Sequence, residues 1–253
     1  MRHLPLAHWL LNHDASTTMG DKVQMTGKST AMSVWLVQPT SRKIAKGTID
    51  RVLIASHTAQ LLDENGLEAF TMRALGGRLG VSAMAFYAHV RHKDDVLELA
   101  QDHVMGALKV APGPWDAVLR QLADDYRRLL VAHPWLPTLA GRYLNAGPNV
   151  TSMTTLAANA LSDGGLPPHL ITASLSAVFA LAHGHGAIEA AWMAKGSQGE
   201  LDDLTRQLAQ RSPQDPVLAF RAESGTSTSS ATEWNFALDC LLLGISRRIL
   251  DNA

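Results

Sequence analysis

Hydrophobic residues recur at intervals of three and four along most of the chain, a spacing that is typical of amphipathic helices. In the first such segment, four residues share one face: Val52, Ala55, Ala59 and Leu62. No segment shows the alternation of apolar and polar positions expected of a half-buried strand, and no internal repeat is found. The sequence therefore predicts an all-α protein.

Short helices follow one another closely in the next segment. Thr71 is placed to cap a helix that ends at Gly80, and Ser82 is placed to cap another over residues 83–90. A further helix begins after His92. Two short helices joined by a glycine-containing turn form a helix-turn-helix, whose second helix fits the DNA major groove of about 12 Å. This segment predicts DNA binding.

The second half of the chain has longer helical patterns. Pro112 and Pro114 mark a break. Beyond it, apolar periodicity predicts helices over residues 115–129, 149–163, 169–194 and 233–250, a modest helix near 200–210, and a flexible loop over 224–230. We expect a poorly ordered extension over 1–41, a DNA-binding domain over 42–110 and a larger helical domain over 111–253.

The charge distribution sharpens this division. The 253 residues carry a formal net charge of −1, which by itself does not favour a nucleic-acid partner. Residues 42–93, however, hold 8 Lys and Arg against 4 Asp and Glu, a net of +4, whereas residues 112–253 hold 10 against 13, a net of −3. The near-neutral total therefore combines a basic module with an acidic one.

Other compositional features point to a cytoplasmic location. The single cysteine, Cys240, lies in an apolar run, so we interpret it as a buried small hydrophobe, and no internal disulfide is available. No run of about 18 uninterrupted apolar residues predicts a membrane span, and the N-terminus lacks a signal-peptide pattern. We expect no membrane association.

The segment around the helix-turn-helix resembles the tetracycline-repressor (TetR) family of bacterial regulators. The matching pieces are Thr71-Met-Arg73, Leu79-Gly-Val-Ser82, Phe86-Tyr-Ala-His-Val90 and Lys93. The resemblance continues into the larger domain, where the matching pieces include Trp115, His133-Pro-Trp135, Gly147-Pro-Asn149 and Phe236-Ala-Leu238. It covers roughly residues 45–250 and implies an N-terminal DNA-binding domain followed by a ligand-binding and dimerisation domain.

Roles in DNA binding follow from this resemblance. It implies phosphate contacts from four residues: Thr71, Tyr87, His89 and Lys93. It also implies a DNA contact from Arg73. Base edges would be read by the start of the second helix, at Ser82, Ala83, Met84 and Ala85. Small apolar side chains touch thymine methyl groups but make no bidentate hydrogen bonds, so we expect Arg73 and DNA shape to carry more of the specificity.

The two most apolar helices of the larger domain are candidates for a dimer interface. In the family, the helices matching 169–194 and 233–250 pair with their symmetry mates in a four-helix bundle. A twofold dimer would place two recognition helices on half-sites about 34–36 Å apart in a pseudo-palindromic double-stranded DNA operator. The alternative is that these faces are buried within the monomer.

A small-molecule effector pocket is expected among the helices from 115 to 195. The candidate lining residues are Trp135, Tyr143, Met153, Leu156, Phe179, His183 and Trp192. Aromatic and Met residues at helical spacing are also common in an ordinary core, so that alternative stays open. His183 and His185 point about 200° apart on a helix, and we therefore expect neither a metal site nor a cofactor.

These observations favour a dimeric transcriptional repressor that a small molecule releases from its operator. Two alternatives remain: an all-α enzyme, and a protein-interaction scaffold without specific DNA binding. The sequence contains no phosphate-binding loop, dinucleotide turn, zinc signature or nucleophile motif, so we identify no catalytic residues.

Overall fold

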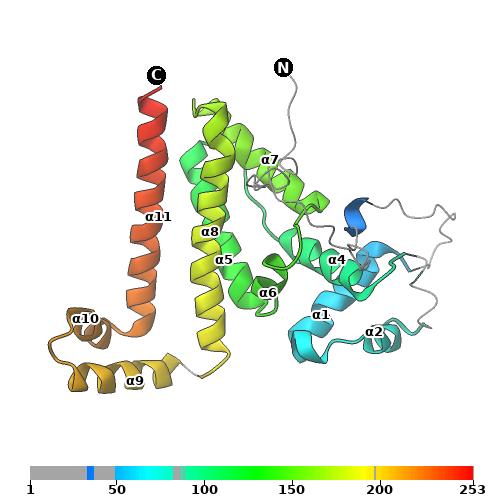
Figure 1. Cartoon of the computed structure of the whole chain (residues 1–253), viewed down its shortest axis with the longest axis horizontal. Coiled ribbons are helices and arrows are strands. Elements are labelled where there is room, and N and C mark those ends of the chain that lie inside the picture. Colours follow the sequence, from blue (N-terminus) through cyan, green and yellow to red (C-terminus); the bar gives the residue numbers. More distant parts are fainter. Residues whose placement is uncertain (1–32, 37–48, 82–86, 88, 197, 253) are drawn as a thin grey trace, which may run out of the picture.

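The computed structural model describes residues 33–36, 49–81, 87, 89–196 and 198–252 (Figure 1). The described residues contain no strand, which confirms the all-α prediction. In chain order the elements are a 3-10 turn η2 (Val34–Leu36) and the helices α1 (Arg51–Ala69), α2 (Met72–Leu79), α4 (Lys93–Met105), α5 (Trp115–Ala132), α6 (Leu136–Ala140), α7 (Pro148–Asp163), α8 (Pro168–Met193), α9 (Gln198–Arg211), α10 (Pro216–Ser224) and α11 (Thr226–Leu250).

Helices α1, α2 and α4 pack together at one end of the molecule (Figure 1). Asp50 caps α1 by accepting a hydrogen bond from the Leu53 backbone N–H at 2.7 Å, and the chain kinks at Gly66, where φ is 75°. Of the four residues placed on one face, Ala55, Ala59 and Leu62 are buried, whereas Val52, in the first turn of α1, is exposed.

Part of the expected N-terminal extension belongs to the core of this domain. Val34 in η2 is only 1% exposed and joins the same hydrophobic cluster as Ile54 of α1 and Leu97 of α4. The remaining residues of the extension, 1–32 and 37–41, lie outside the described residues. For Ser33–Leu36, therefore, the structure differs from the expectation of poor order.

The larger domain is built around the long contact between α5 and α8. Helix α7 packs against both, and α6 joins the end of α5 to α4. Gly186 allows the close approach of α8 to α5, because a Cβ atom there would lie 2.8 Å from Leu130 Cδ1 and 3.0 Å from the Arg127 carbonyl oxygen. Some of the small residues of α8 therefore serve packing within the chain.

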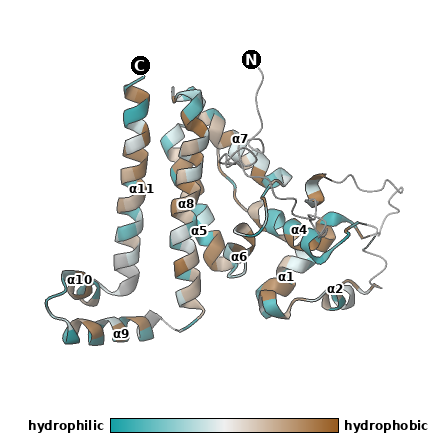
Figure 2. Ribbon diagram, in the orientation of Figure 1, coloured by the Kyte–Doolittle hydropathy of each residue, from teal (hydrophilic) through white to brown (hydrophobic). Residues whose placement is uncertain are grey.

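Helix α8 contains no long uninterrupted apolar run, but its length and mean hydropathy alone would allow it to cross a membrane, a test that buried core helices also pass (Figure 2). One face of α8 packs on α5 through Leu175, Val178 and Ala182. Its other face leaves Ala180 and Ile188 exposed. The high hydropathy of α8 thus comes from two apolar faces.

The segment between α8 and α11 corrects two sequence predictions. Residues 226–230, expected in a flexible loop, are helical, and an additional helix, α10, precedes them. Gly225, with φ of 76°, turns the chain between α10 and α11, and the contacts between these helices outweigh the weak helix propensity of Ser and Thr. Cys240 is exposed rather than buried, because it lies on the side of α11 opposite Leu238 and Leu242.

Candidate functional site

The helix-turn-helix begins with a capped short helix, as predicted. Thr71 Oγ1 accepts a hydrogen bond from the Ala74 backbone N–H at 3.1 Å, and α2 ends at Gly80 in the left-handed conformation, with φ of 66°. The Val81 N–H then donates to the Gly76 carbonyl at 3.0 Å. Leu75 is fully buried and anchors α2 to the domain core. This turn sets the direction in which the chain leaves α2.

The predicted base-reading residues Ser82, Ala83, Met84 and Ala85 lie outside the described residues. Tyr87 is 44% exposed, and His89 is half-buried. Residues 87 and 89 lie in turns and Val90 is buried, so the predicted helix does not extend to residue 90. The buried Val90 and the extended N-cap of α4 at His92 require non-helical backbone at this point.

The two cationic side chains assigned to DNA contacts lie at the starts of α2 and α4. Arg73 is exposed in the first turn of α2. Lys93 Nζ donates a hydrogen bond to the Phe70 carbonyl at 2.9 Å and lies 5.3 Å from the centre of the Phe70 ring. An ammonium group has three donors, so this bond leaves Lys93 two donors for a phosphate oxygen. The contact with Phe70 holds the ammonium at the first turn of α4.

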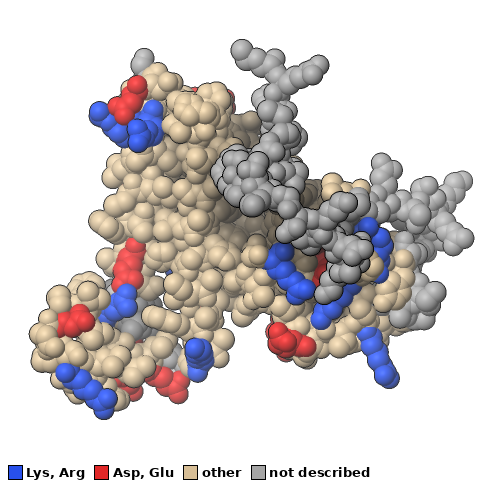
Figure 3. Space-filling view, in the orientation of Figure 1, with Lys and Arg blue, Asp and Glu red and all other residues tan. Residues whose placement is uncertain are grey.

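Positive side chains gather over the domain formed by α1, α2 and α4 on the face drawn in Figure 3. Two of the arginines in this domain have carboxylate partners: Arg78 pairs with Glu64, and Arg91 pairs with Asp95 at 3.1 Å. Burial raises the pKa of the Asp95 carboxyl, but hydrogen bonds from the Arg91 side chain and backbone outweigh it and leave that pKa below its usual value. Some of the basic side chains therefore also form ion pairs within the domain.

Asp63 joins the domain formed by α1, α2 and α4 to the larger domain. Its Oδ1 atom accepts a hydrogen bond from the Trp135 indole Nε1–H at 2.7 Å and lies 2.7 Å from His133 Nδ1. Trp135, predicted to line an effector pocket, is thus a buried residue at the domain boundary. A movement of the corner between α5 and α6 would act directly on α1.

Two aspartates of α4 make further links between the domains. Asp94 accepts a hydrogen bond from the Tyr143 hydroxyl at 2.6 Å, so this second predicted pocket residue also lies at the boundary. Asp102 accepts from the backbone N–H groups of Asn149 at 3.3 Å and Val150 at 3.1 Å. Helix α7 has no side-chain cap of its own, and Asp102 supplies one from α4.

Asp102 requires a glycine opposite it. A Cβ atom on Gly147 would lie 2.1 Å from Asp102 Cγ, so a larger residue could enter only if the carboxylate moved. Asp102 itself is 2% exposed. Helix α4 and the start of α7 are thereby held in one arrangement.

The other predicted effector-binding residues lie in different places. Phe179 and His183 meet across Tyr126 of α5, whose ring is 5.5 Å from that of Phe179 and whose hydroxyl is 3.3 Å from His183 Nδ1. Met153 is buried on α7, Leu156 is half-buried there, and Trp192 is exposed at the end of α8. The structure therefore brings together only part of the predicted set.

Tyr126 belongs to this cluster, although it is not among the residues predicted to line the effector pocket. Burial raises the pKa of the Tyr126 phenol to about 12, so the hydroxyl keeps its proton at neutral pH. The available signal was a tyrosine, with its hydroxyl group, among the apolar positions Trp115, Leu119, Leu122 and Leu129 of the same helix. His185 contacts Trp234 instead of this cluster, as expected for residues two apart on a helix.

A second cluster positions α11. Trp234 Nε1 donates a hydrogen bond to Asp124 at 2.6 Å, and the Arg127 guanidinium lies 5.1 Å from the centre of a Trp234 ring. Arg127 also pairs with Glu189 of α8 at 2.6 Å. These contacts tie α5, α8 and α11 together on the buried side of α11.

The outer side of α11 carries an apolar stripe of Phe236, Leu243 and Leu250, which are 70%, 69% and 66% exposed. The stripe has a spacing of seven residues, typical of a helix that pairs with another helix. Beside it, a groove of about 310 Å³ between α8 and α11 is lined by Leu170, Ala173, Ser174, Ala177, Cys240, Leu241, Gly244, Ile245 and Arg248.

The helix-turn-helix and the larger helical domain define a helical DNA-binding regulator, and comparisons with known proteins identify its family. Residues 54–100 match the model for bacterial regulatory proteins of the tetR family, and residues 110–249 match the tetracyclin repressor-like C-terminal domain. The chain belongs to the TetR family. It is a DNA-binding transcriptional regulator.

Curated relatives agree with this assignment. An HTH-type transcriptional regulator of Saccharopolyspora erythraea is 32% identical over 205 residues, which cover 79% of this chain and 86% of the relative. The HTH-type transcriptional repressor DrrR1 of Streptomyces coeruleorubidus is 32% identical over 115 residues, which cover 42% of each chain.

Solved structures show the same fold. Apo ActR from Streptomyces coelicolor aligns with a TM-score of 0.67 at 24% identity, over 83% of this chain and 100% of that chain. ActR in complex with actinorhodin aligns with a TM-score of 0.67 at 23% identity, over 79% of this chain and 96% of that chain.

Proposed function

We propose that the protein is a homodimeric repressor that binds a pseudo-palindromic operator and that a small molecule releases it. The observation that carries the proposal is the aspartate linkage of the two domains, through Asp63, Asp94 and Asp102. These carboxylates join the helices of the DNA-binding domain to α7 and to the segments around α6. A change in the larger domain would therefore reach the DNA-binding helices.

The exposed stripe of α11 supports homodimerisation. Three large apolar side chains in line, next to the exposed small residues of α8, form a surface that association would remove from water. The alternative is that these helix faces are buried within the monomer. In a monomer, however, Phe236, Leu243 and Leu250 remain exposed. The proposed interface comprises the outer faces of α8 and α11, and no membrane is required to cover them.

We assign phosphate contacts to Thr71, Tyr87, His89 and Lys93 and place base reading at residues 82–85, with Arg73 as an additional DNA contact. Exposure of Arg73 and Tyr87 supports this assignment. The Thr71 hydroxyl accepts the Ala74 N–H bond and still has its own hydrogen to donate to a phosphate.

Replacing Lys93 with alanine is expected to weaken binding to all duplex sequences alike and to lower the slope of log K against log salt by about 1. The reason is that a phosphate contact is electrostatic and reads no base. Fluorescence anisotropy with two unrelated duplexes over a salt series measures both quantities. An unchanged slope would remove Lys93 from the phosphate contacts.

The effector site is proposed to lie among α5, α7 and α8, near the cluster of Tyr126, Phe179 and His183. This cluster offers two aromatic faces and one polar imidazole–phenol pair, which suits a small aromatic ligand with a polar group. The complex of ActR with actinorhodin shows a small molecule bound to a protein of the same fold. Trp135 and Tyr143 would transmit the effect of binding to Asp63 and Asp94.

We propose that the protein acts as a cytoplasmic regulator rather than as an enzyme. Its relatives are transcriptional regulators, and its DNA target is found in the cytoplasm of bacteria. Neither a metal nor a cofactor is part of the proposed mechanism. Release of the operator by an effector without chemical change of that effector is the behaviour expected.

A further inference from the structure

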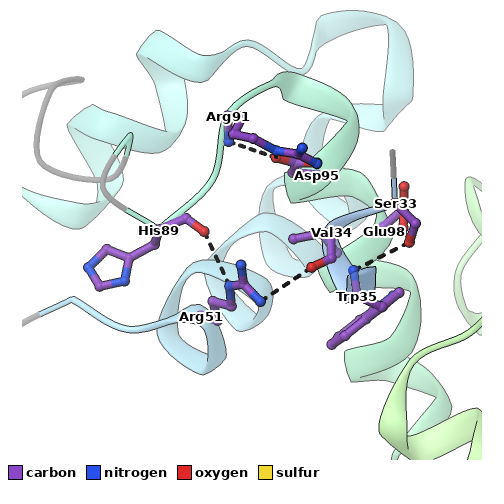
Figure 4. A network of polar contacts seen from close by, with 8 residues as sticks. All are labelled: Ser33, Val34, Trp35, Arg51, His89, Arg91, Asp95 and Glu98. Atoms are coloured by element: carbon purple, nitrogen blue, oxygen red, sulfur yellow. Dashed lines mark hydrogen bonds and ion pairs between the residues drawn. The ribbon is translucent and has the colours of Figure 1, made fainter. Parts of the chain in front are cut away.

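The short turn η2 is attached to the DNA-binding domain on two sides (Figure 4). Val34 fills a place in the core between α1 and α4, and the Ser33 hydroxyl donates a hydrogen bond to Glu98 of α4. Burial raises the pKa of the Glu98 carboxyl, against the effect of this hydrogen bond. Leu36, at the other end of the turn, is exposed. The segment therefore contacts the domain through Ser33, which precedes the turn, and through Val34.

Arg51, the first residue of α1, connects this turn with the chain that follows residues 82–88. Its Nε–H donates to the His89 carbonyl at 3.2 Å, and its Nη1–H donates to the Val34 carbonyl at 3.4 Å (Figure 4). A guanidinium group is planar and carries donors on separate edges, so one side chain can hold both carbonyls in a fixed relation. A lysine ammonium in its place lacks this fork.

The turn at His89 is held from the opposite side as well. The Arg91 backbone N–H donates to Asp95 Oδ2 at 2.7 Å, which fixes the chain two residues after the His89 carbonyl. The arrangement therefore clamps residues 89–91 between α1 and α4. Tyr87, assigned to a phosphate contact, lies two residues before this clamp.

We propose that Ser33–Leu36 is a structural part of the DNA-binding domain that is needed for full DNA affinity. Arg51 is a positioning residue, which couples this segment to the end of the recognition segment at His89. Arg51 lies in the basic segment 42–93, where an arginine is also a candidate for a phosphate contact. Its two carbonyl partners instead give it an internal role. The proposal rests on DNA binding by this domain and adds to it a reason for the N-terminal turn.

The test is the affinity of the full chain for duplex DNA over a salt series, measured for the wild type, Arg51→Lys and Arg51→Gln. A positioning residue acts through geometry, so both variants are expected to lose about tenfold in affinity, a modest orientational effect equal to about 1.4 kcal/mol, at every salt concentration. The salt slope is expected to stay at the wild-type value. Wild-type affinity of Arg51→Lys, or a slope lowered by about 1 as for a phosphate contact, would overturn the proposal.

Hydrogen exchange on the DNA-free protein provides a second readout. In Arg51→Lys, the amides of residues 33–36 and 89–92 are expected to exchange faster, while those of α5 and α8 keep their protection. Arg78→Lys is the matched control, because Arg78 pairs with the surface carboxylate of Glu64 and should change neither exchange nor affinity. Unchanged exchange at 33–36 and 89–92 would contradict the coupling even if the wild-type chain failed to bind DNA.

Discussion

Replacing Leu243 with glutamate is expected to make the protein monomeric and to lower its affinity for an inverted-repeat operator by at least about 100-fold. Leu243 is the middle residue of the exposed stripe on α11, and a carboxylate there would be buried without a partner in the proposed interface. Loss of the dimer removes the gain in affinity, about 10²–10⁴, that linking two binding modules supplies. Sedimentation velocity and DNA-binding titrations measure the two effects.

Leu144→Glu is the matched control for this prediction. Leu144 is also an exposed leucine, but it lies in the segment between α6 and α7, away from the stripe. The control is expected to remain dimeric and to bind DNA as the wild type does. A Leu243→Glu protein that stays dimeric, or a monomer with wild-type operator affinity, would remove α11 from the interface.

Replacing Asp102 with alanine is expected to lower the free energy of unfolding by about 2–3 kcal/mol. The carboxylate caps α7 from another helix, so its loss leaves the N–H groups of Asn149 and of the buried Val150 without their acceptor. The same change loosens α4 from α7, and we expect a weaker effect of the effector on DNA binding. Urea unfolding followed by circular dichroism measures the stability.

Asp116→Ala separates this effect from the general loss of an acidic residue. Asp116 is exposed in the first turn of α5, and its replacement is expected to change stability by no more than about 0.5 kcal/mol. If Asp102→Ala were as stable as Asp116→Ala, the interdomain cap would contribute little. The proposed route through α4 would then lose its strongest contact.

Local sequence signals predicted the first helix of the helix-turn-helix, its turn and the start of α4, because these elements are set by neighbours in the chain. The cap at Thr71, the turn at Gly80 and the start of α4 after His92 all follow from local backbone chemistry. The burial of Leu75 follows from helical periodicity in the same way.

Helical periodicity could not predict burial or contacts that depend on residues far away in the sequence. Val34 is buried because α1 and α4 leave a place for it, and nothing in the residues around it indicates a core position. Cys240 was predicted to be buried because its run is apolar, but α11 has two apolar sides and Cys240 lies on the outer one. In the same way, Trp135 is an aromatic residue whose partner, Asp63, lies in the other domain.

For the proposed effector site, the sequence indicated several of the residues but not which of them lie together in space. The sequence marked Phe179 and His183 but not Tyr126, whose ring contacts both. Trp135 and Tyr143, predicted to line an effector pocket, both donate hydrogen bonds across the domain boundary, which the sequence did not indicate. Such contacts depend on how two helices cross, which a single helical pattern does not contain.

The most direct test of a dimeric operator-binding regulator is selection of binding sites from random duplex DNA with the full chain. The expected product is an inverted repeat whose half-site centres lie about 34–36 Å apart, one helical turn of DNA. Repeating the selection with Arg73→Ala is expected to relax the base preference, because the apolar side chains at residues 83–85 make no bidentate hydrogen bonds to bases. Enrichment of no sequence, or of a single unrepeated site, would contradict the proposed dimeric reading of DNA.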